Sequence, residues 1–185
     1  NPAAPGVLYA GAAWDGVFKS VDGGALWQAV NTGLSVASIF SLAVDPLTPT
    51  TLYAGSDRGI YKSLDRGGSW YGINATLPVY SDVNALAINP MTPDTLFAGI
   101  GDLIFKSMDG GEVWGFYILD SHIYALAIDP ITPTTLYAGT RDYGIFKTTD
   151  GGVHWAAVNT GLTCGSHPCS IEAVRSSSAR TSKFT

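Results

Sequence analysis

Charged side chains are scarce in this chain of 185 residues, and basic ones are the scarcer kind. Lys and Arg number 10 against 15 Asp and Glu, so the net charge is −5, and the basic residues form no cluster. A nucleic-acid partner requires a basic surface that displaces counterions from phosphates. The composition therefore predicts that the chain binds no nucleic acid.

Long apolar runs are also missing. No stretch approaches the roughly 20 consecutive apolar residues that cross a bilayer as a helix, so we expect no membrane span. The first residues, Asn1 to Pro5, contain neither the basic start nor the apolar stretch of a secretory leader. We expect either that a leader has been removed or that the chain is a piece of a longer protein.

Cysteine occurs only at Cys164 and Cys169, with His167 between them. A structural zinc site takes four ligands, and the sequence has no second cluster to supply them. We therefore expect no metal and no other cofactor. A disulfide that closes this short loop is favoured over two free thiols, and both alternatives stay open.

The residues that are abundant indicate an all-β protein. Hydrophobic residues make up 46% of the chain, and 22 glycines and 10 prolines are spread among them. This mixture is typical of many short strands joined by tight turns. No segment shows a sustained 3.6-residue periodicity, so we expect almost no helix.

A repeat runs through most of the chain. The motif Leu-(Tyr/Phe)-Ala-Gly begins at Leu8, Leu52, Leu96 and Leu136, and a (Phe/Tyr)-Lys-(Ser/Thr) motif follows each copy. The spacing of about 40–45 residues, with four short strands in each unit, is typical of a β-propeller blade. In the second unit the four expected strands cover about 39–45, 51–55, 59–63 and 69–73.

We expect one domain over residues 1–174, a β-propeller of four-stranded antiparallel blades, followed by a polar tail at 175–185. An extra strand at 170–174 either completes the first blade, which has no inner strand of its own, or begins a fifth. A partial propeller is favoured over a complete four-bladed ring, because open terminal blades leave unpaired strand edges. The expected blades cover about 7–30, 39–73, 83–118 and 123–158.

An octapeptide, Ser/Thr-x-Asp-x-Gly-x-x-Trp, lies between the third and fourth expected strands of every unit. It resembles the Asp-box of the BNR-repeat propellers. That family includes sialidases, sortilin-type receptors, xyloglucan-cleaving glycoside hydrolases and photosystem II assembly factors. The Asp and Trp of the four copies are Asp22 and Trp27, Asp65 and Trp70, Asp109 and Trp114, and Asp150 and Trp155.

Simple chemistry gives these residues structural roles. An Asp side chain accepts hydrogen bonds from backbone N–H groups just downstream and so closes the turn. The glycines allow the positive φ of a tight hairpin, and the Trp supplies an apolar face that seals the outer end of the blade. The four aspartates are therefore poor candidates for catalysis.

A binding site is expected on the opposite face, around the mouth of the central channel. The turns between the second and third strands and the connections between units emerge there, and they carry acidic and aromatic residues together with His122. The competing interpretation is that Asp before Gly is a favoured turn residue in any protein. The candidate ligand-binding residues are Trp14, Asp15, Asp57, Arg58, Tyr80, Asp82, Asp102, Asp142 and Tyr143.

These residue types favour a non-catalytic scaffold or binding module of a secreted or cell-surface protein, which binds a protein or a polysaccharide. A sialidase would need three arginines around the substrate carboxylate, which the sequence does not supply. The resemblance leaves two alternatives: a fragment of a xyloglucan-cleaving glycoside hydrolase, and a protein like the photosystem II assembly factors. The hydrolases place their catalytic aspartates between two propellers, and the assembly factors are expected to carry a basic patch. We also expect further blades in a longer parent chain.

Overall fold

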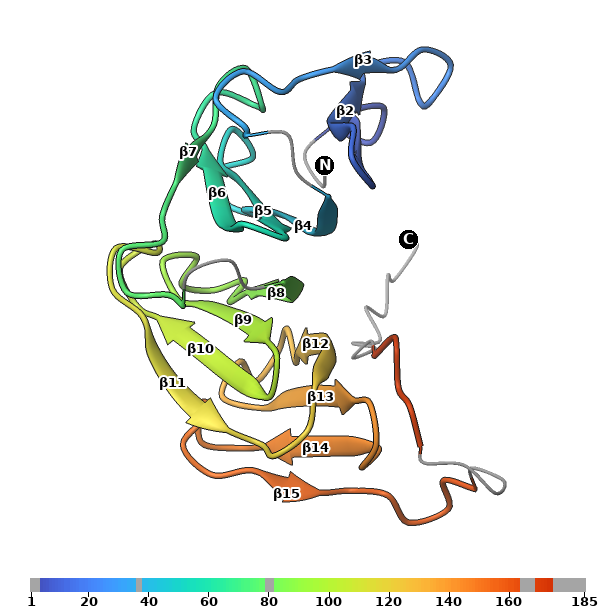
Figure 1. Ribbon diagram of the computed structural model, residues 1–185, viewed down its shortest axis with the longest axis vertical. Coiled ribbons are helices and arrows are strands. Elements are labelled where there is room, and N and C mark those ends of the chain that lie inside the picture. The colour runs from blue at the N-terminus through green and yellow to red at the C-terminus, as the bar shows by residue number, and fades with distance from the viewer. Residues whose placement is uncertain (1–3, 36–37, 79–81, 164–168, 175–185) are drawn as a thin grey trace, which may run out of the picture.

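The computed structural model describes residues 4–35, 38–78, 82–163 and 169–174. All strands in these residues belong to four antiparallel sheets, which fan out around one side of a common axis (Figure 1). The described residues contain no helix that is long and apolar enough to cross a membrane. The prediction of an all-β fold built from four repeated sheets is confirmed.

Each sheet is a meander of consecutive strands, and we call the sheets blades 1 to 4. Blade 1 contains β1 (Leu8–Ala12), β2 (Gly16–Ser20) and β3 (Gln28–Ala29). Blade 2 contains β4 (Ile39–Val44), β5 (Leu52–Ser56), β6 (Gly59–Ser63) and β7 (Tyr71–Gly72). Blade 3 contains β8 (Val83–Ile88), β9 (Leu96–Ile100), β10 (Leu103–Ser107) and β11 (Gly115–Ile118). Blade 4 contains β12 (Ile123–Ile128), β13 (Leu136–Thr140), β14 (Ile145–Thr148) and β15 (Ala156–Ala157).

The inner strands β4, β8 and β12 lie closest to the axis, and the outer strands β7, β11 and β15 lie at the periphery (Figure 1). Glycine in β1, and in the second strand of blade 3, lets the inner strand of the next blade approach closely. A Cβ atom built on Gly99 would lie 2.6 Å from Cγ2 of Ile123, and one on Gly11 would lie 2.5 Å from Cγ2 of Ile39. The Leu-(Tyr/Phe)-Ala-Gly motif thus ends in glycine because a neighbouring blade occupies that space.

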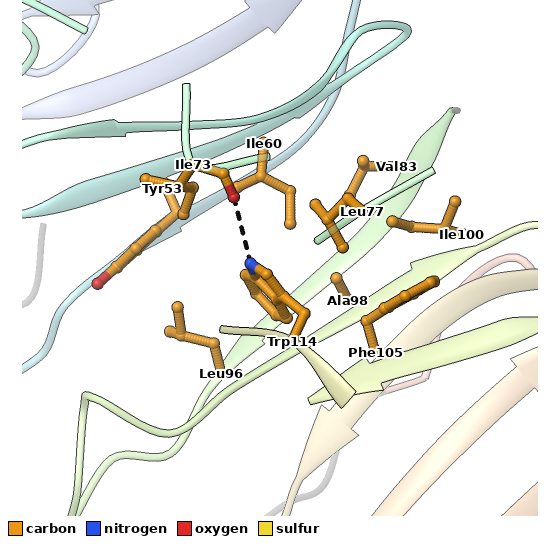
Figure 2. Close-up of a cluster of buried hydrophobic side chains, with 10 residues drawn as sticks. All are labelled: Tyr53, Ile60, Ile73, Leu77, Val83, Leu96, Ala98, Ile100, Phe105 and Trp114. Carbon is orange, nitrogen blue, oxygen red and sulfur yellow. Dashed lines mark hydrogen bonds between the residues drawn. The ribbon is translucent and has the colours of Figure 1, made fainter. Parts of the chain in front are cut away.

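The hydrophobic cores lie between blades as well as within them. One cluster joins Tyr53 and Ile60 of blade 2 to Leu96, Phe105 and Trp114 of blade 3 (Figure 2). The indole Nε1 of Trp114 donates a hydrogen bond to the carbonyl oxygen of Ile73, 3.2 Å away, so the ring is also tied to the preceding blade. Neighbouring blades therefore share one core.

Residues 170–174, where the sequence predicts a strand, form no ladder. Cys169 makes an isolated parallel bridge with Tyr143, and the N–H of Ile171 donates to the carbonyl oxygen of Thr140 at 2.9 Å. A ladder requires an adjacent strand. Residues 170–174 do not supply the missing inner strand of blade 1, because β1 pairs with β2 alone in the described residues. Cys169 is in a disulfide, and Cys164 lies outside the described residues.

The turns at 20–27, 63–70, 107–114 and 148–155, which we call the Asp turns, share one hydrogen-bond pattern. In the second, the Ser63 hydroxyl donates to Oδ1 of Asp65 at 2.8 Å and accepts from the N–H of Gly67 at 2.9 Å. Oδ1 of Asp65 also accepts from the N–H of Ser69 at 2.8 Å. The same bonds recur in the other three turns. Each aspartate therefore holds its own turn closed.

Acid should weaken the fold through these turns. Hydrogen bonds from the Ser69 hydroxyl, the Ser69 N–H and the Ser63 hydroxyl lower the pKa of Asp65 from 3.8 to about 2. Hydrogen bonds also lower the pKa values of Asp22, Asp109 and Asp150. A carboxyl with a lowered pKa in the folded state stabilises that state above its unfolded pKa, and the stabilisation is lost as the pH falls through the folded pKa. We expect the guanidinium concentration at the unfolding midpoint to decrease as the pH is lowered from about 4 to about 2.

Denaturation curves at several pH values in this interval measure the effect. The variant Asp65→Asn removes one titrating carboxyl, so its midpoint should fall less than that of the unmodified protein over the same interval. Equal falls in the two proteins would show that Asp65 does not contribute to the acid sensitivity.

Candidate functional site

Three of the polar residues expected at the channel mouth line one cavity of about 370 Å³ between blades 3 and 4. Asp82 directly precedes β8, Asp102 lies in the turn from β9 to β10, and His122 directly precedes β12. The side chains of all three are exposed. Asn84 completes the polar lining, and Ile100 and Leu103 supply apolar walls.

Backbone hydrogen bonds fix the loops around this cavity. The N–H of Ile123 donates to the carbonyl oxygen of Gly101 at 2.7 Å, and the N–H of Leu119 donates to that of Asp102 at 3.0 Å. Asp120, in the connection between the two blades, has a positive φ of 55°. Such a backbone conformation is unusual for a residue with a side chain and persists when the surroundings hold it. The carboxylate of Asp102 thus stands on a well-held turn.

A second cavity of about 390 Å³ is lined by residues of three inner strands and by Glu172. The second residue of each inner strand lies at this cavity: Phe40 in β4, Asn84 in β8 and Tyr124 in β12. The pairing of each inner strand with its neighbour shifts register at this residue. Such a bulge turns a side chain out of the regular alternation. Asn84 lines both cavities, so the two adjoin.

A third cavity of about 340 Å³ lies at blade 1, beside Trp14 and Asp15. Trp14 is 72% exposed and has a positive φ of 70°. Asn31 holds the turn from inside: its Oδ1 accepts from the N–H of Val17 at 2.7 Å, and its Nδ2 donates to the carbonyl oxygen of Asp15 at 2.8 Å. Asn74 makes the matching pair of bonds in blade 2, with the N–H of Ile60 and the carbonyl oxygen of Arg58. Asn159 does so in blade 4, with the N–H of Ile145 and the carbonyl oxygen of Tyr143.

Sequence reasoning missed these asparagines, although a signal for them was present. Val-Asn-Thr-Gly-Leu occurs at 30–34 and again at 158–162, and Asn74 follows Ile73 at the matching place in blade 2. Their side chains donate hydrogen bonds to the turns that carry Asp15, Arg58 and Tyr143, which gives them a positioning role.

The remaining candidates do not line these three cavities. Oδ1 of Asp57 is buried and has no hydrogen-bond partner in the described part of the chain. Arg58 and Asp142 are exposed, and Tyr143 is 58% exposed. Tyr80 lies outside the described residues.

The first two cavities together combine carboxylates, an amide and aromatic rings. Asp82, Asp102 and Glu172 carry oxygens that accept hydrogen bonds, and Asn84 both donates and accepts. Phe40 and Tyr124 offer ring surface, and Phe40 is 46% exposed. A concave site of this size with a few polar groups among apolar ones suits a small polar ligand that also has an apolar face.

Comparison with known proteins identifies the fold. No family model and no curated protein matches the sequence. An ancestral GH74 enzyme superposes with a TM-score of 0.75 at 24% identity, over 85% of this chain and 23% of its own. The extracellular domain of the one-component system BT4673 from B. thetaiotaomicron superposes with a TM-score of 0.70 at 18% identity, over 92% of this chain and 24% of its own.

A structure of YCF48 with a bound peptide is similar over 68% of this chain and 41% of its own, with a TM-score of 0.57 at 16% identity. This chain therefore spans less than half the length of each of these three neighbours. At such identities the likeness concerns the fold alone. Together with the four repeated sheets, it shows that the chain is a set of β-propeller blades.

Proposed function

We propose that this chain is a non-catalytic propeller binding module, of the Asp-box type, whose channel-mouth face binds a glycan. The observation that carries the proposal is the pair of cavities that adjoin at Asn84. One supplies the carboxylates of Asp82 and Asp102, and the other supplies the rings of Phe40 and Tyr124.

A sugar matches this combination of groups. Aromatic rings pack against the apolar face of a sugar ring, and carboxylate and amide oxygens accept hydrogen bonds from its hydroxyls. An extracellular or cell-surface location belongs to the same proposal, since polysaccharides are met there. The neighbours that are named as a GH74 enzyme and as an extracellular domain support it through their fold.

We do not assign hydrolysis to this chain. Glycoside cleavage uses two facing carboxyl groups, one of which is kept protonated by apolar surroundings. Asp82 and Asp102 instead line an open cavity in which both side chains are exposed to solvent. A hydrolase fragment or a peptide-binding protein shares the fold, and the experiment below separates both from a glycan-binding module.

The test is an array of plant and bacterial polysaccharides, on which binding and the release of reducing ends are measured together. We expect binding without release. Asp102→Asn and Tyr124→Ala should each weaken binding about tenfold, because a hydrogen bond to a charged group or a stacked ring is lost. Arg58→Ala, on the same face but away from the two cavities, is the matched control and should leave binding unchanged.

Three results would contradict the proposal. Release of reducing ends that disappears in Asp82→Asn would make the chain catalytic. Binding of peptides but of no polysaccharide would favour a protein ligand. Binding that survives Tyr124→Ala but is lost in Asp109→Ala, in protein that is still folded, would place the ligand on the face of the Asp turns.

A further inference from the structure

One of the four Asp turns differs from the others at the residue that follows the aspartate. Gly23, Gly110 and Gly151 stand there in blades 1, 3 and 4, with positive φ values of 75°, 73° and 72°. Blade 2 has Arg66 instead, and its φ is 63°. Glycine adopts this left-handed conformation freely, whereas a residue with a side chain is destabilised in it. The turn itself does not require an arginine, so the side chain of Arg66 is expected to have another role.

Arg66 lies beside Lys19 of the preceding blade. Nζ of Lys19 donates a hydrogen bond to the carbonyl oxygen of Arg66 at 3.1 Å. The lysines of the next two blades make the same bond to a glycine, at 2.9 Å and 2.8 Å. The bond is therefore a general feature of neighbouring blades. Between blades 1 and 2 it brings the lysine to a second cationic residue.

Lys19 and Arg66 line a cavity of about 330 Å³ between blades 1 and 2, which we call the Asp-turn cavity. Thr50 supplies a hydroxyl, and the other lining residues are apolar, among them Val7 and Val21. A concave site with apolar walls and a few polar groups is the usual form of a small-ligand site, and this volume is at the lower end of the range. The cavity lies at the end of the blades that carries the Asp turns, so it is separate from the channel-mouth face.

The blade 1 side of the Asp-turn cavity has the same backbone hydrogen bonds as its counterparts in the other blades. The N–H of Val7 donates to the carbonyl oxygen of Ala4 at 2.8 Å, as that of Thr51 does to Thr48 in blade 2. A second bond ties this turn to the Asp turn in all four blades, at 2.8–2.9 Å. The shape of the cavity therefore follows from the repeated geometry of the blades.

The two cations of the cavity are not balanced by a carboxylate in the described part of the chain. Neither makes an ion pair there, and no acidic residue lines the cavity. In blade 3, Asp94 takes the place of Thr50. A Cβ atom built on Gly110 would lie 3.4 Å from Oδ1 of Asp94 and 3.0 Å from Nζ of Lys62, so a carboxylate lies near the lysine at that interface. Between blades 1 and 2 a hydroxyl replaces the carboxylate, and the positive charge is available to a ligand.

We infer that the Asp-turn cavity is a second ligand site, which binds a phosphate or sulfate ester of a small organic molecule. The guanidinium of Arg66 presents paired N–H groups that match two oxygens of such an ester. The ammonium of Lys19 has three donors, and the carbonyl oxygen of Arg66 uses one of them. Thr50 adds a hydroxyl donor, and Val7 and Val21 offer apolar surface to the organic part of the ester.

Titration calorimetry with phenyl phosphate and phenyl sulfate at low ionic strength tests the site. We expect saturable binding of both esters, with an affinity that falls as salt is added because the charges are screened. Arg66→Gly should weaken binding about tenfold, since it removes a bidentate contact to a charged group. This variant has the residue of the other three Asp turns, and glycine adopts the conformation without strain, so it should stay folded.

Thr50→Asp gives a second test, because it places a carboxylate where blade 3 has Asp94. It should also weaken the binding of both esters about tenfold, since like charges then face each other. The fold should persist, because the carbonyl oxygen of Asp94 accepts the same backbone bond as that of Thr50, at 2.9 Å in both blades. Arg141→Ala is the matched control: it removes the same charge as Arg66→Gly from an exposed turn on the channel-mouth face and should leave the affinity unchanged.

The two esters distinguish the sources of the ligand. Tighter binding of phenyl phosphate would assign the site to phosphate esters, and tighter binding of phenyl sulfate would assign it to sulfate esters. Three results would overturn the inference: no saturable binding of either ester, equal affinity in Arg66→Gly and the unmodified chain, or binding of uncharged phenol that is as tight as that of the esters.

Discussion

Replacing Trp114 with alanine should lower the free energy of unfolding by about 3–5 kcal/mol. The ring is 5% exposed and lies within the cluster that joins blades 2 and 3 (Figure 2). Its removal leaves a cavity in that shared core. It also removes the donor to the carbonyl oxygens of Ile73 and Gly111, which lie 3.2 Å and 3.1 Å from Nε1. Both effects act in the same direction.

Guanidinium denaturation monitored by circular dichroism measures the loss. Trp14→Ala removes the same ring at a place that is 72% exposed, so it should change stability by only about 0.5 kcal/mol. Equal losses in the two variants would show that the core between blades 2 and 3 is not what makes Trp114 important.

Gly55→Ala should lower the free energy of unfolding by about 1–3 kcal/mol, although it adds a single methyl group. The new Cβ atom would lie 2.3 Å from Oγ of Ser41 and 2.7 Å from both Cγ1 and the carbonyl oxygen of Val83. Val83 begins the inner strand of blade 3, so backbone must move to make room. The hydrogen bond of 3.0 Å from the Ser41 hydroxyl to the Val83 carbonyl oxygen would be disturbed as well.

Gly115→Ala is the matched control for this variant. A Cβ atom on Gly115, at the start of β11, would meet nothing within 4 Å, and the residue does not have a positive φ. Alanine there should leave stability unchanged or raise it slightly, because it reduces the freedom of the unfolded chain. A similar loss in both variants would mean that the close approach of neighbouring blades is not the cause.

The repeat motifs were sufficient to predict the first three strands of a four-stranded blade. They predicted the length of the outer strand less well. The stretch predicted at 59–63 is β6, Gly59–Ser63, whereas the one predicted at 69–73 is reduced to β7, Tyr71–Gly72. The difference has a physical cause. Asp65 draws the N–H of Ser69 into the Asp turn, so that residue is not available to the ladder.

The channel-mouth face was predictable in part. Chain connectivity alone indicates that the connections carrying Asp82, Asp102 and His122 emerge at one end of the blades, and the three side chains line one cavity. Phe40 and Tyr124 could not be found in this way. They sit at bulges, and a bulge shifts the alternation of side chains without leaving a mark in the hydrophobic pattern.

Because every blade is fastened only to its neighbours, the protein behaves as a short linear array rather than as one uniform body. Among the described residues, blades 2 and 3 each have an interface on both sides, whereas blades 1 and 4 each have one. Within the described residues, opening blade 1 or blade 4 breaks one interface and opening blade 2 or blade 3 breaks two, so backbone amides of the former exchange with solvent through fraying, and those of the latter through wider unfolding. The carboxylates of Asp82 and Asp102 are carried by blade 3, and they therefore sit on the part of the array that opens least.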